Sequence, residues 1–211
     1  MSIILLDIGN VIVSVDFLPF CRTVARNAGS GEHEMFRRYC EGDLKNRFDK
    51  GGIAPYEYLH LIARDPFARK MPLHQLKAAW QNIFSLKEGC SEAVPLLKRH
   101  HTVWIMSDTD PLHFTFLLNN YAVLRGIECY YLSYEHGTLK SSVDAFNHVL
   151  DSSGCLPGDF LLIDDRKENC AACEKAGMGS LLFLSWPETL ATLGLQHASD
   201  RETEQFSSCS G

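Results

Sequence analysis

The chain lacks the sequence features that would direct a protein into or across a membrane. Met1 leads straight into a short apolar segment, without a basic stretch followed by a long apolar core, so we expect no signal peptide. No apolar run approaches the roughly 20 residues that a membrane-spanning helix needs. The sequence therefore predicts a cytoplasmic protein that has no membrane partner.

Positive charge is also scarce in this chain. The 20 Lys and Arg residues are outnumbered by 26 Asp and Glu residues, which leaves a net charge of −6. Proteins that bind nucleic acid need a basic surface to face the phosphate backbone. The longest basic cluster, Lys98-Arg99-His100-His101, has the character of a helix end, so we expect no nucleic-acid partner.

The eight cysteines show no disulfide or zinc-binding pattern. They are scattered along the chain, and no second pair accompanies Cys170 and Cys173, which fall inside a predicted helix. Scattered cysteines in a protein of a reducing compartment are typically buried free thiols. We therefore predict no disulfide framework.

Between the first strand and residue 100 the sequence shows only helical patterns. Glycine and proline breaks such as Gly51-Gly52, Asp65-Pro66 and Met71-Pro72 separate them. The predicted helices are Phe17–Asn27, Glu32–Cys40, Asp43–Asp49, Pro55–Arg64, Leu73–Phe84 and Ser91–His100. Within this stretch, Phe17, Phe48 and Trp80 are the candidates for aromatic residues near the entrance of a site.

After residue 100, short apolar strands alternate with helices. The predicted strands, together with residues 3–7, are 102–106, 128–132, 160–163 and 180–184. Such alternation is typical of a parallel sheet covered on both faces. The predicted fold class is α/β, a Rossmann-like doubly wound parallel sheet with an inserted helical domain. We predict a core of residues 1–15 and 88–196, an inserted domain of 16–87, and a disordered tail of 197–211.

Two of the predicted strands end in carboxylates, Asp7 and the pair Asp164-Asp165. An unpaired buried carboxylate is costly, but strand ends in open α/β sheets border the ligand crevice. Carboxylates that meet there can share a divalent cation, and one of them can act as a nucleophile. Ser107, at another strand end, and Lys140 could bind a substrate phosphate.

These residues appear in an order that resembles the haloacid-dehalogenase-like (HAD) hydrolase superfamily. The four matching segments are Asp7-Ile8-Gly9-Asn10-Val11, Ser107, Lys140, and Asp164-Asp165 with Asn169. The helical insertion resembles the C1 cap domain of that superfamily. Further stretches, Trp80-Gln81-Asn82-Ile83-Phe84 and Tyr131-Leu132-Ser133, resemble a branch that contains an α-D-glucose-1-phosphate phosphatase.

The resemblance implies a role for each matching residue. Asp7 would be the nucleophile, with Lys140 beside it as the second catalytic residue. Mg²⁺ would be held by Asp7, the carbonyl of Gly9 and Asp165, with Asp164 as an outer or water-mediated ligand and Asn169 behind them. The residues expected to bind the substrate phosphate are Ser107, Asp108, Lys140 and Asn10.

Three positions depart from the pattern of the family. Gly9 stands where most of these phosphatases have a second Asp as general acid and base, a group worth about 10²–10⁴-fold in rate. Asp108 replaces the usual Asn and would repel a phosphate unless it is paired. Ser141 replaces a proline that mainly restricts the backbone.

Three functions remain open from the sequence. The first is an Mg²⁺-dependent phosphatase for a small phosphorylated metabolite, such as a sugar phosphate or a nucleotide, acting as a monomer or homodimer. The second is a metal-free haloacid dehalogenase, which Gly9 fits but the carboxylate pair does not. The third is a weak or inactive HAD-like protein that binds a ligand.

Overall fold

A twisted sheet of five parallel strands forms the centre of the molecule. The computed structural model describes residues 2–195, so the tail predicted for residues 197–211 lies outside the described part. The strands are ordered β5-β4-β1-β6-β7 and all neighbouring pairs are parallel. Their bounds are β1 Ile3–Leu6, β4 Thr102–Ser107, β5 Tyr130–Leu132, β6 Phe160–Asp164 and β7 Gly179–Leu182. The predicted α/β doubly wound fold is confirmed.

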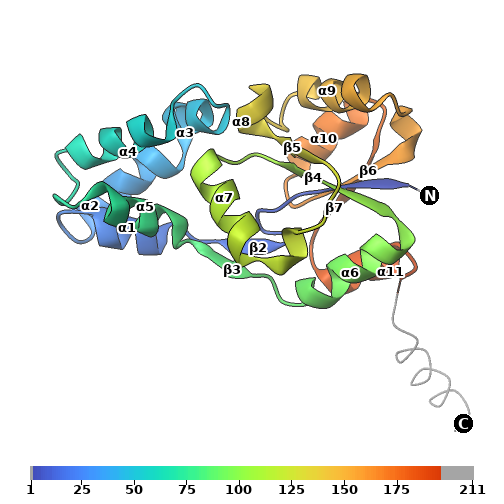
Figure 1. The fold of residues 1–211 in the computed structure, drawn as a ribbon, viewed down its shortest axis with the longest axis horizontal. Helices are drawn as coiled ribbons and strands as arrows, with labels where there is room; N and C mark the ends of the chain where they lie inside the picture. Colours follow the sequence, from blue (N-terminus) through green and yellow to red (C-terminus); the bar gives the residue numbers. More distant parts are fainter. Residues whose placement is uncertain (1, 196–211) are drawn as a thin grey trace, which may run out of the picture.

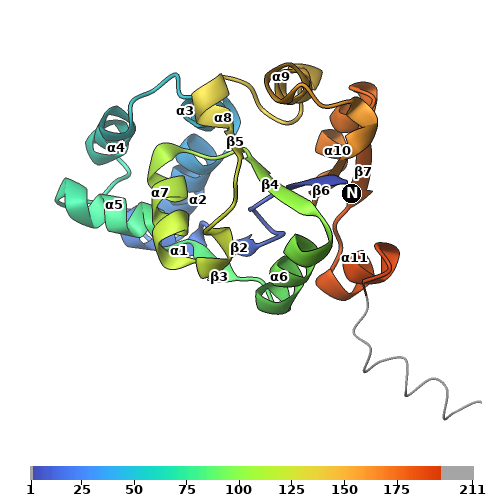
Figure 2. The ribbon, with the colours of Figure 1, turned by 45° about the vertical axis from the view of Figure 1, so that its right-hand side comes forward.

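Helices cover both faces of this sheet, as Figures 1 and 2 show. On one face lie α9 (Val143–Ser153) and α10 (Lys167–Lys175), and on the other α6 (Cys90–His100), α7 (Pro111–Asn120) and α11 (Trp186–Thr192). Successive strand residues point to opposite faces, so Leu5 joins the apolar cluster under α9 and α10, whereas Ile4 and Leu6 join the other. Strands buried on both faces explain why the sequence shows continuous apolar runs there.

The residues between β1 and β4 include a group of helices that lies beside the sheet (Figure 1). We call residues 18–81 the helical insertion. It comprises α1 (Leu18–Val24), α2 (Ser30–Met35), the π-helix η1 (Phe36–Cys40), α3 (Gly42–Asp49), α4 (Pro55–Arg64) and α5 (Leu73–Gln81). These helices share their own apolar cluster, which contains Trp80 and Tyr58 and also takes in Leu112 from α7.

A short antiparallel ribbon connects the helical insertion to the sheet. It pairs β2 (Val13–Val15) with β3 (Phe84–Leu86). The segment that enters the helical insertion and the segment that leaves it therefore lie side by side. The prediction of only helices up to residue 100 is wrong here, because α5 ends at Gln81 and a strand follows. Each strand has three residues and depends on a partner about 70 positions away, so local periodicity carried no signal for it.

Local sequence signals account for several of the helix starts. Asp110 precedes α7, and its side chain accepts hydrogen bonds from the N–H groups of Leu112 and His113 at 2.9 and 3.0 Å. Pro111 follows at the first helical position, where the missing N–H costs nothing. The side chain of Ser142 caps α9 in the same way. The remaining short elements are η2 (Ala122–Leu124), α8 (Ser133–His136) and η3 (Pro157–Asp159).

The cysteines within the described residues are free, as predicted. Cys21 and Cys40 lie closest, with 3.8 Å between their sulfur atoms. Cys173 contacts the carbonyl of Gly179, so it serves as a packing residue on α10. Across residues 2–195, none of the helices combines the length and the apolar character that crossing a membrane requires.

Candidate active site

Asp7 stands where the first parallel strand ends, at the carboxyl edge of the sheet. Its backbone N–H donates to the carbonyl of Ile163 at 3.1 Å, which continues the pairing of β1 with β6 to this position. The residue is 5 % exposed, and its Oδ1 accepts from the N–H of Ile8 at 2.7 Å. Burial raises the pKa of Asp7 above its ordinary value of 3.8, and the negative charge of Asp164 adds to this effect. Lys140 lowers the pKa in part, and the result is about 7. Strand pairing thus holds this carboxylate in a fixed position.

Lys140 lies on the turn between α8 and α9 and contacts two of the carboxylates. Its Nζ is 2.6 Å from Oδ1 of Asp7 and 2.5 Å from Oδ2 of Asp164. The residue is 2 % exposed. Burial lowers the pKa of Lys140, but the nearby Asp7, Asp164 and Asp108 raise it by more, so the amine stays charged. One buried ammonium therefore offsets part of the negative charge at this edge of the sheet.

The carboxylate pair after β6 divides into an inner and an outer residue. Asp164 is fully buried, accepts from the backbone N–H of Arg166 at 2.9 Å, and accepts from Nδ2 of Asn169 at 3.0 and 3.1 Å. Asp165 is more exposed, and its Oδ2 accepts from Nδ2 of Asn10 at 3.1 Å. Asn169 thus pairs with the inner carboxylate, Asp164. The first turn of α10 carries the Asn169 side chain back under the strand end, where it meets Asp164.

The three carboxylates suit a divalent cation. Asp7, Asp164 and Asp165 each offer an oxygen, and these oxygens all lie within 4.8 Å of one another. Asp7 and Asp165 line a cavity of about 120 Å³ that Gly9 and Asn169 also line. Oδ1 of Asn169 is buried and, among the described residues, finds no hydrogen-bond donor. A cluster of hard oxygen atoms with an unsatisfied amide oxygen beside it fits Mg²⁺, either directly or through its water shell.

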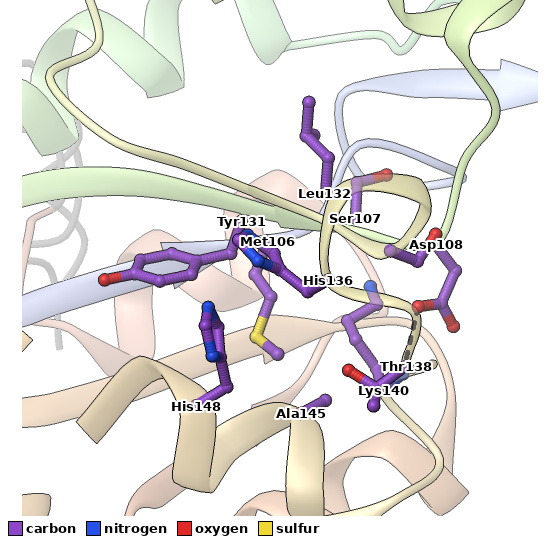
Figure 3. Close-up of a pocket in the computed structure, with 11 residues that line it drawn as sticks. Met106, Ser107, Asp108, Tyr131, Leu132, His136, Thr138, Lys140, Ala145 and His148 are labelled. Atoms are coloured by element: carbon purple, nitrogen blue, oxygen red, sulfur yellow. Dashed lines mark hydrogen bonds between the residues drawn. The ribbon is translucent and has the colours of Figure 1, made fainter. Parts of the chain in front are cut away.

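Ser107 is the last residue of β4, the strand next to β1, and Asp108 follows it. Ser107 is 4 % exposed. The carboxylate of Asp108 accepts from the backbone N–H of Lys140 at 2.9 Å, the bond drawn as a dashed line in Figure 3. Burial raises the pKa of Asp108, while Lys140 lowers it. Asp108 therefore lines the same cavity as Asp7 and Lys140, and its side chain is paired in part.

The space on the far side of Ser107 and Asp108 is narrow. Figure 3 shows Tyr131, His136 and His148 between β5 and α9, and they leave a cavity of only about 10 Å³. That volume suffices for a single water molecule. A small organic molecule does not fit in that space, so the wider opening on the opposite side, which faces the helical insertion, is the candidate for substrate binding.

A cleft of about 450 Å³ lies on that opposite side, between the sheet and the helical insertion. Lys45, Asn46 and Asp49 of α3 line one wall. Gly9, Ser107 and Asp108 line the other, together with Thr109, His113 and Arg166. Its volume is that of a typical site for a small organic molecule.

Most of the expected residues meet at this cleft or at the smaller cavity beside it, but two aromatic residues do not. Phe17 lines the cleft. Phe48 and Trp80 are 0 % exposed and belong to the apolar cluster of the helical insertion, so the expectation that they lie near the entrance is wrong. Their helices turn these side chains inward, and sequence alone does not distinguish the inner from the outer aromatic residues.

Arg166 is a site residue that the sequence reasoning missed. It lines both the cleft and the cavity that holds the carboxylates. Its place directly after Asp164-Asp165, at the end of a strand, was the signal that could have identified it.

Several known proteins are similar to this chain in sequence or in fold. No protein-family model matches the chain. A D-ribitol-5-phosphate phosphatase from Bacteroides thetaiotaomicron is 22 % identical over 179 residues, which is 79 % of this chain and 84 % of that protein.

Two solved structures superpose over most of the chain. A HAD family enzyme from Bacteroides thetaiotaomicron, in complex with magnesium and inorganic phosphate, has a TM-score of 0.72 at 21 % identity, covering 86 % of this chain and 93 % of that one. A predicted HAD-like family hydrolase from Porphyromonas gingivalis has a TM-score of 0.75 at 18 % identity, covering 93 % and 99 %.

The parallel sheet, the helical insertion and the carboxylates at the strand ends define an α/β protein with a cluster of carboxylates that could hold a divalent cation. The chain has the fold of the haloacid-dehalogenase-like (HAD) superfamily, so the resemblance seen in the sequence is confirmed at the level of the fold.

Proposed function

We propose that the protein is an Mg²⁺-dependent phosphatase that hydrolyses a small phosphorylated metabolite. One observation carries this proposal. Asp7 lies between Lys140 and two further carboxylates, in a small cavity that shares Gly9, Asp108 and Arg166 with a cleft sized for a small molecule. The likeness to a ribitol-phosphate phosphatase supports the same class of reaction.

In the proposed reaction the Asp7 carboxylate attacks the phosphorus atom, and the bond to the leaving alkoxide breaks. Water then hydrolyses the aspartyl-phosphate, which releases inorganic phosphate and restores Asp7. Lys140 keeps Asp7 oriented through their 2.6 Å contact and supplies a fixed positive charge while negative charge develops. Ser107 offers its hydroxyl to a phosphoryl oxygen.

Mg²⁺ bound to Asp7, Asp165 and the Gly9 carbonyl would offset the repulsion between these carboxylates and the phosphate. Asp164 is fully buried and paired with Lys140 and Asn169, so we assign it to holding the site together from beneath. Asn10 donates to Asp165 and orients it. We also propose that the helical insertion closes over the substrate as a cap, and that the protein acts in the cytoplasm as a monomer or homodimer.

The test is hydrolysis of p-nitrophenyl phosphate by the purified protein, with Mg²⁺ and with excess chelator. We expect turnover that depends on Mg²⁺ and is lost in Asp7→Asn. Asp151→Asn, an exposed residue on α9, is the matched control and should retain full turnover. A panel of polyol, sugar and nucleoside monophosphates then identifies the substrate.

Two results would contradict the proposal. Dehalogenation of 2-chloropropionate without metal, with no phosphatase activity, would assign the metal-free reaction. If the protein binds phosphate but turns over neither substrate, it is a ligand-binding protein. The lack of an acid at Gly9 would then account for the missing activity.

A further inference from the structure

The cavity beside Asp7 holds more negative than positive charge. Three carboxylates, Asp7, Asp108 and Asp165, line it, and a fourth, Asp164, is buried beneath it. Lys140 and Arg166 are the cations that line it. Lys140 is already in contact with two of the carboxylates and is buried between them. A divalent cation would bring this set to neutrality, and a phosphate dianion would add two further negative charges. The site as a whole therefore depends on each of its cations to bind phosphate.

Asp108 makes this imbalance most acute. It lines the cleft as well as the cavity, so it faces the position that a substrate phosphate occupies on its way to Asp7. The hydrogen bond that it accepts from the Lys140 backbone satisfies part of the carboxylate but does not neutralise its charge. At separations near 5 Å, two like charges in a partly buried site repel strongly enough to weaken binding about 10-fold or more.

Arg166 lies where an additional positive charge is needed. Its backbone N–H donates to Asp164 at 2.9 Å, which fixes the residue at the start of α10. Its side chain lines both the cleft and the cavity, and it is 53 % exposed at their common mouth. At present its Nε donates to Oε1 of Glu168 at 2.8 Å. Both partners of this ion pair are exposed, so the guanidinium can exchange Glu168 for a better anion at little cost.

We propose that Arg166 binds the phosphoryl oxygens of the substrate and offsets the charge of Asp108. The planar guanidinium presents several N–H donors in a fork that matches two phosphate oxygens, and this recognition is stronger than a point charge provides. Glu168 holds the side chain near the mouth of the site in the absence of phosphate. The inference rests on the proposed phosphatase function, because it assumes that the cleft admits a phosphate.

The test measures the affinity for inorganic phosphate by isothermal titration calorimetry in the presence of Mg²⁺. We expect Arg166→Gln to weaken phosphate binding by about 10- to 100-fold, as the loss of a charge-assisted hydrogen bond does. Arg166→Lys should recover part of the affinity. Arg99→Gln, on an exposed part of α6, is the matched control and should leave the affinity unchanged.

Asp108 provides the compensating variant. Asp108→Asn keeps an oxygen that can accept from the Lys140 backbone but removes the negative charge, so phosphate should bind about 10-fold more tightly. The double variant with Arg166→Gln should return to within about three-fold of the wild-type affinity. Equal phosphate affinity in Arg166→Gln and the wild type would overturn the inference, as would an Asp108→Asn variant that binds no more tightly.

The two proposals fail in different ways. If the wild type turns over p-nitrophenyl phosphate and binds phosphate, but Arg166→Gln matches it in both, the role of Arg166 alone is wrong. If the wild type neither binds phosphate nor hydrolyses the ester, the phosphatase function is wrong and the role of Arg166 with it. Circular dichroism and the melting temperature of each variant show whether a lost affinity reflects a lost fold.

Discussion

The indole N–H of Trp80 donates to Oδ2 of Asp110 at 3.2 Å, and both residues are 0 % exposed. Trp80 belongs to α5 of the helical insertion, whereas Asp110 precedes α7, which covers the sheet. Nδ1 of His113 lies 2.8 Å from the same carboxylate oxygen, and the Trp80 and His113 rings stack at 4.7 Å. The buried carboxylate of Asp110 thus caps the start of α7, which covers the sheet. The same carboxylate binds Trp80 and so connects the helical insertion to α7.

Trp80→Phe tests how much this anchor contributes. The variant loses the hydrogen bond to Asp110 and part of the ring that packs against Phe20 and Tyr58. We expect the free energy of unfolding to fall by roughly 2–4 kcal/mol, measured by urea unfolding with circular dichroism.

Trp104→Phe is the control for Trp80→Phe. Trp104 is less buried, and its Nε1 has no partner among residues 2–195, so replacing it by Phe removes an unpaired donor. We expect a loss below about 1.5 kcal/mol. Losses of the same size in the two variants would show that ring volume alone, and not the bond to Asp110, explains the effect.

Asp110 should also shape the acid unfolding of the protein. Burial raises the pKa of Asp110, but His113 and Lys45 outweigh burial and bring the pKa from 3.8 to about 2. A depressed pKa stabilises the fold above the unfolded value of 3.8, and this contribution disappears as the pH falls toward 2. The contribution of Asp110 to the free energy of unfolding is roughly 2 kcal/mol.

Asp110→Asn isolates this contribution, because an Asn side chain can still cap α7. We expect the variant to be less stable than the wild type at pH 7. The difference in unfolding free energy should narrow as the pH falls from about 4 to about 2, measured by urea unfolding at each pH. A difference that stays constant over this range would contradict the assigned pKa.

A second contact between the helical insertion and the rest of the molecule joins the end of α3 to α8, and a substitution at Gly51 tests it. A Cβ at Gly51 would lie 2.2 Å from the carbonyl oxygen of Tyr134 on α8, and φ at Gly51 is +71°. The Ser133 hydroxyl donates to the Asp49 carbonyl at 2.6 Å in the same contact. Gly51→Ala should therefore separate α3 from α8, lower the melting temperature, and raise the KM by moving the Asp49 wall of the cleft.

Gly154, which follows α9 and does not line the cleft, supplies a control with the same backbone but open space. Its φ is +68°, and a Cβ there would meet nothing within 4 Å. Gly154→Ala should cost only the roughly 1–2 kcal/mol of the left-handed conformation, with the KM unchanged. If the two variants were equally stable and equally active, the contact with Tyr134 would have no role in placing α3.

Replacing Gly9 tests which step limits the turnover of the proposed reaction. A Cβ there would meet only Cγ2 of Val15, at an ordinary 3.7 Å, so the position accepts a Cβ. If protonation of the leaving group limits turnover, Gly9→Asp should raise kcat for an alkyl phosphate by about 10²-fold or more. The gain should be small for p-nitrophenyl phosphate, whose leaving group departs without a proton.

Gly9→Asn is the control for this prediction, since it fills the same space without an acid and should not raise kcat. Gains of similar size on the two esters, or an equal gain in Gly9→Asn, would show that the added group acts by some means other than proton transfer. Initial rates at saturating substrate and Mg²⁺ decide between these results.

The sequence by itself determined the sheet and the edge at which the site lies. Apolar runs such as Ile3–Leu6 and Phe160–Asp164 are buried on both faces only in a parallel sheet covered by helices. The carboxyl ends of parallel strands share one edge, so Asp7, Ser107 and Asp164 had to meet there. Chain order and strand direction were sufficient for this part of the prediction.

Only the tertiary structure decided which of these residues touch. Asn169 reaches Asp164 and not Asp165, because the helix start folds back under the strand. The β2–β3 ribbon joins segments about 70 residues apart, and Trp80 meets Asp110 from a different layer of the molecule. Such contacts depend on how whole elements pack in three dimensions, and local sequence patterns carry no record of that packing.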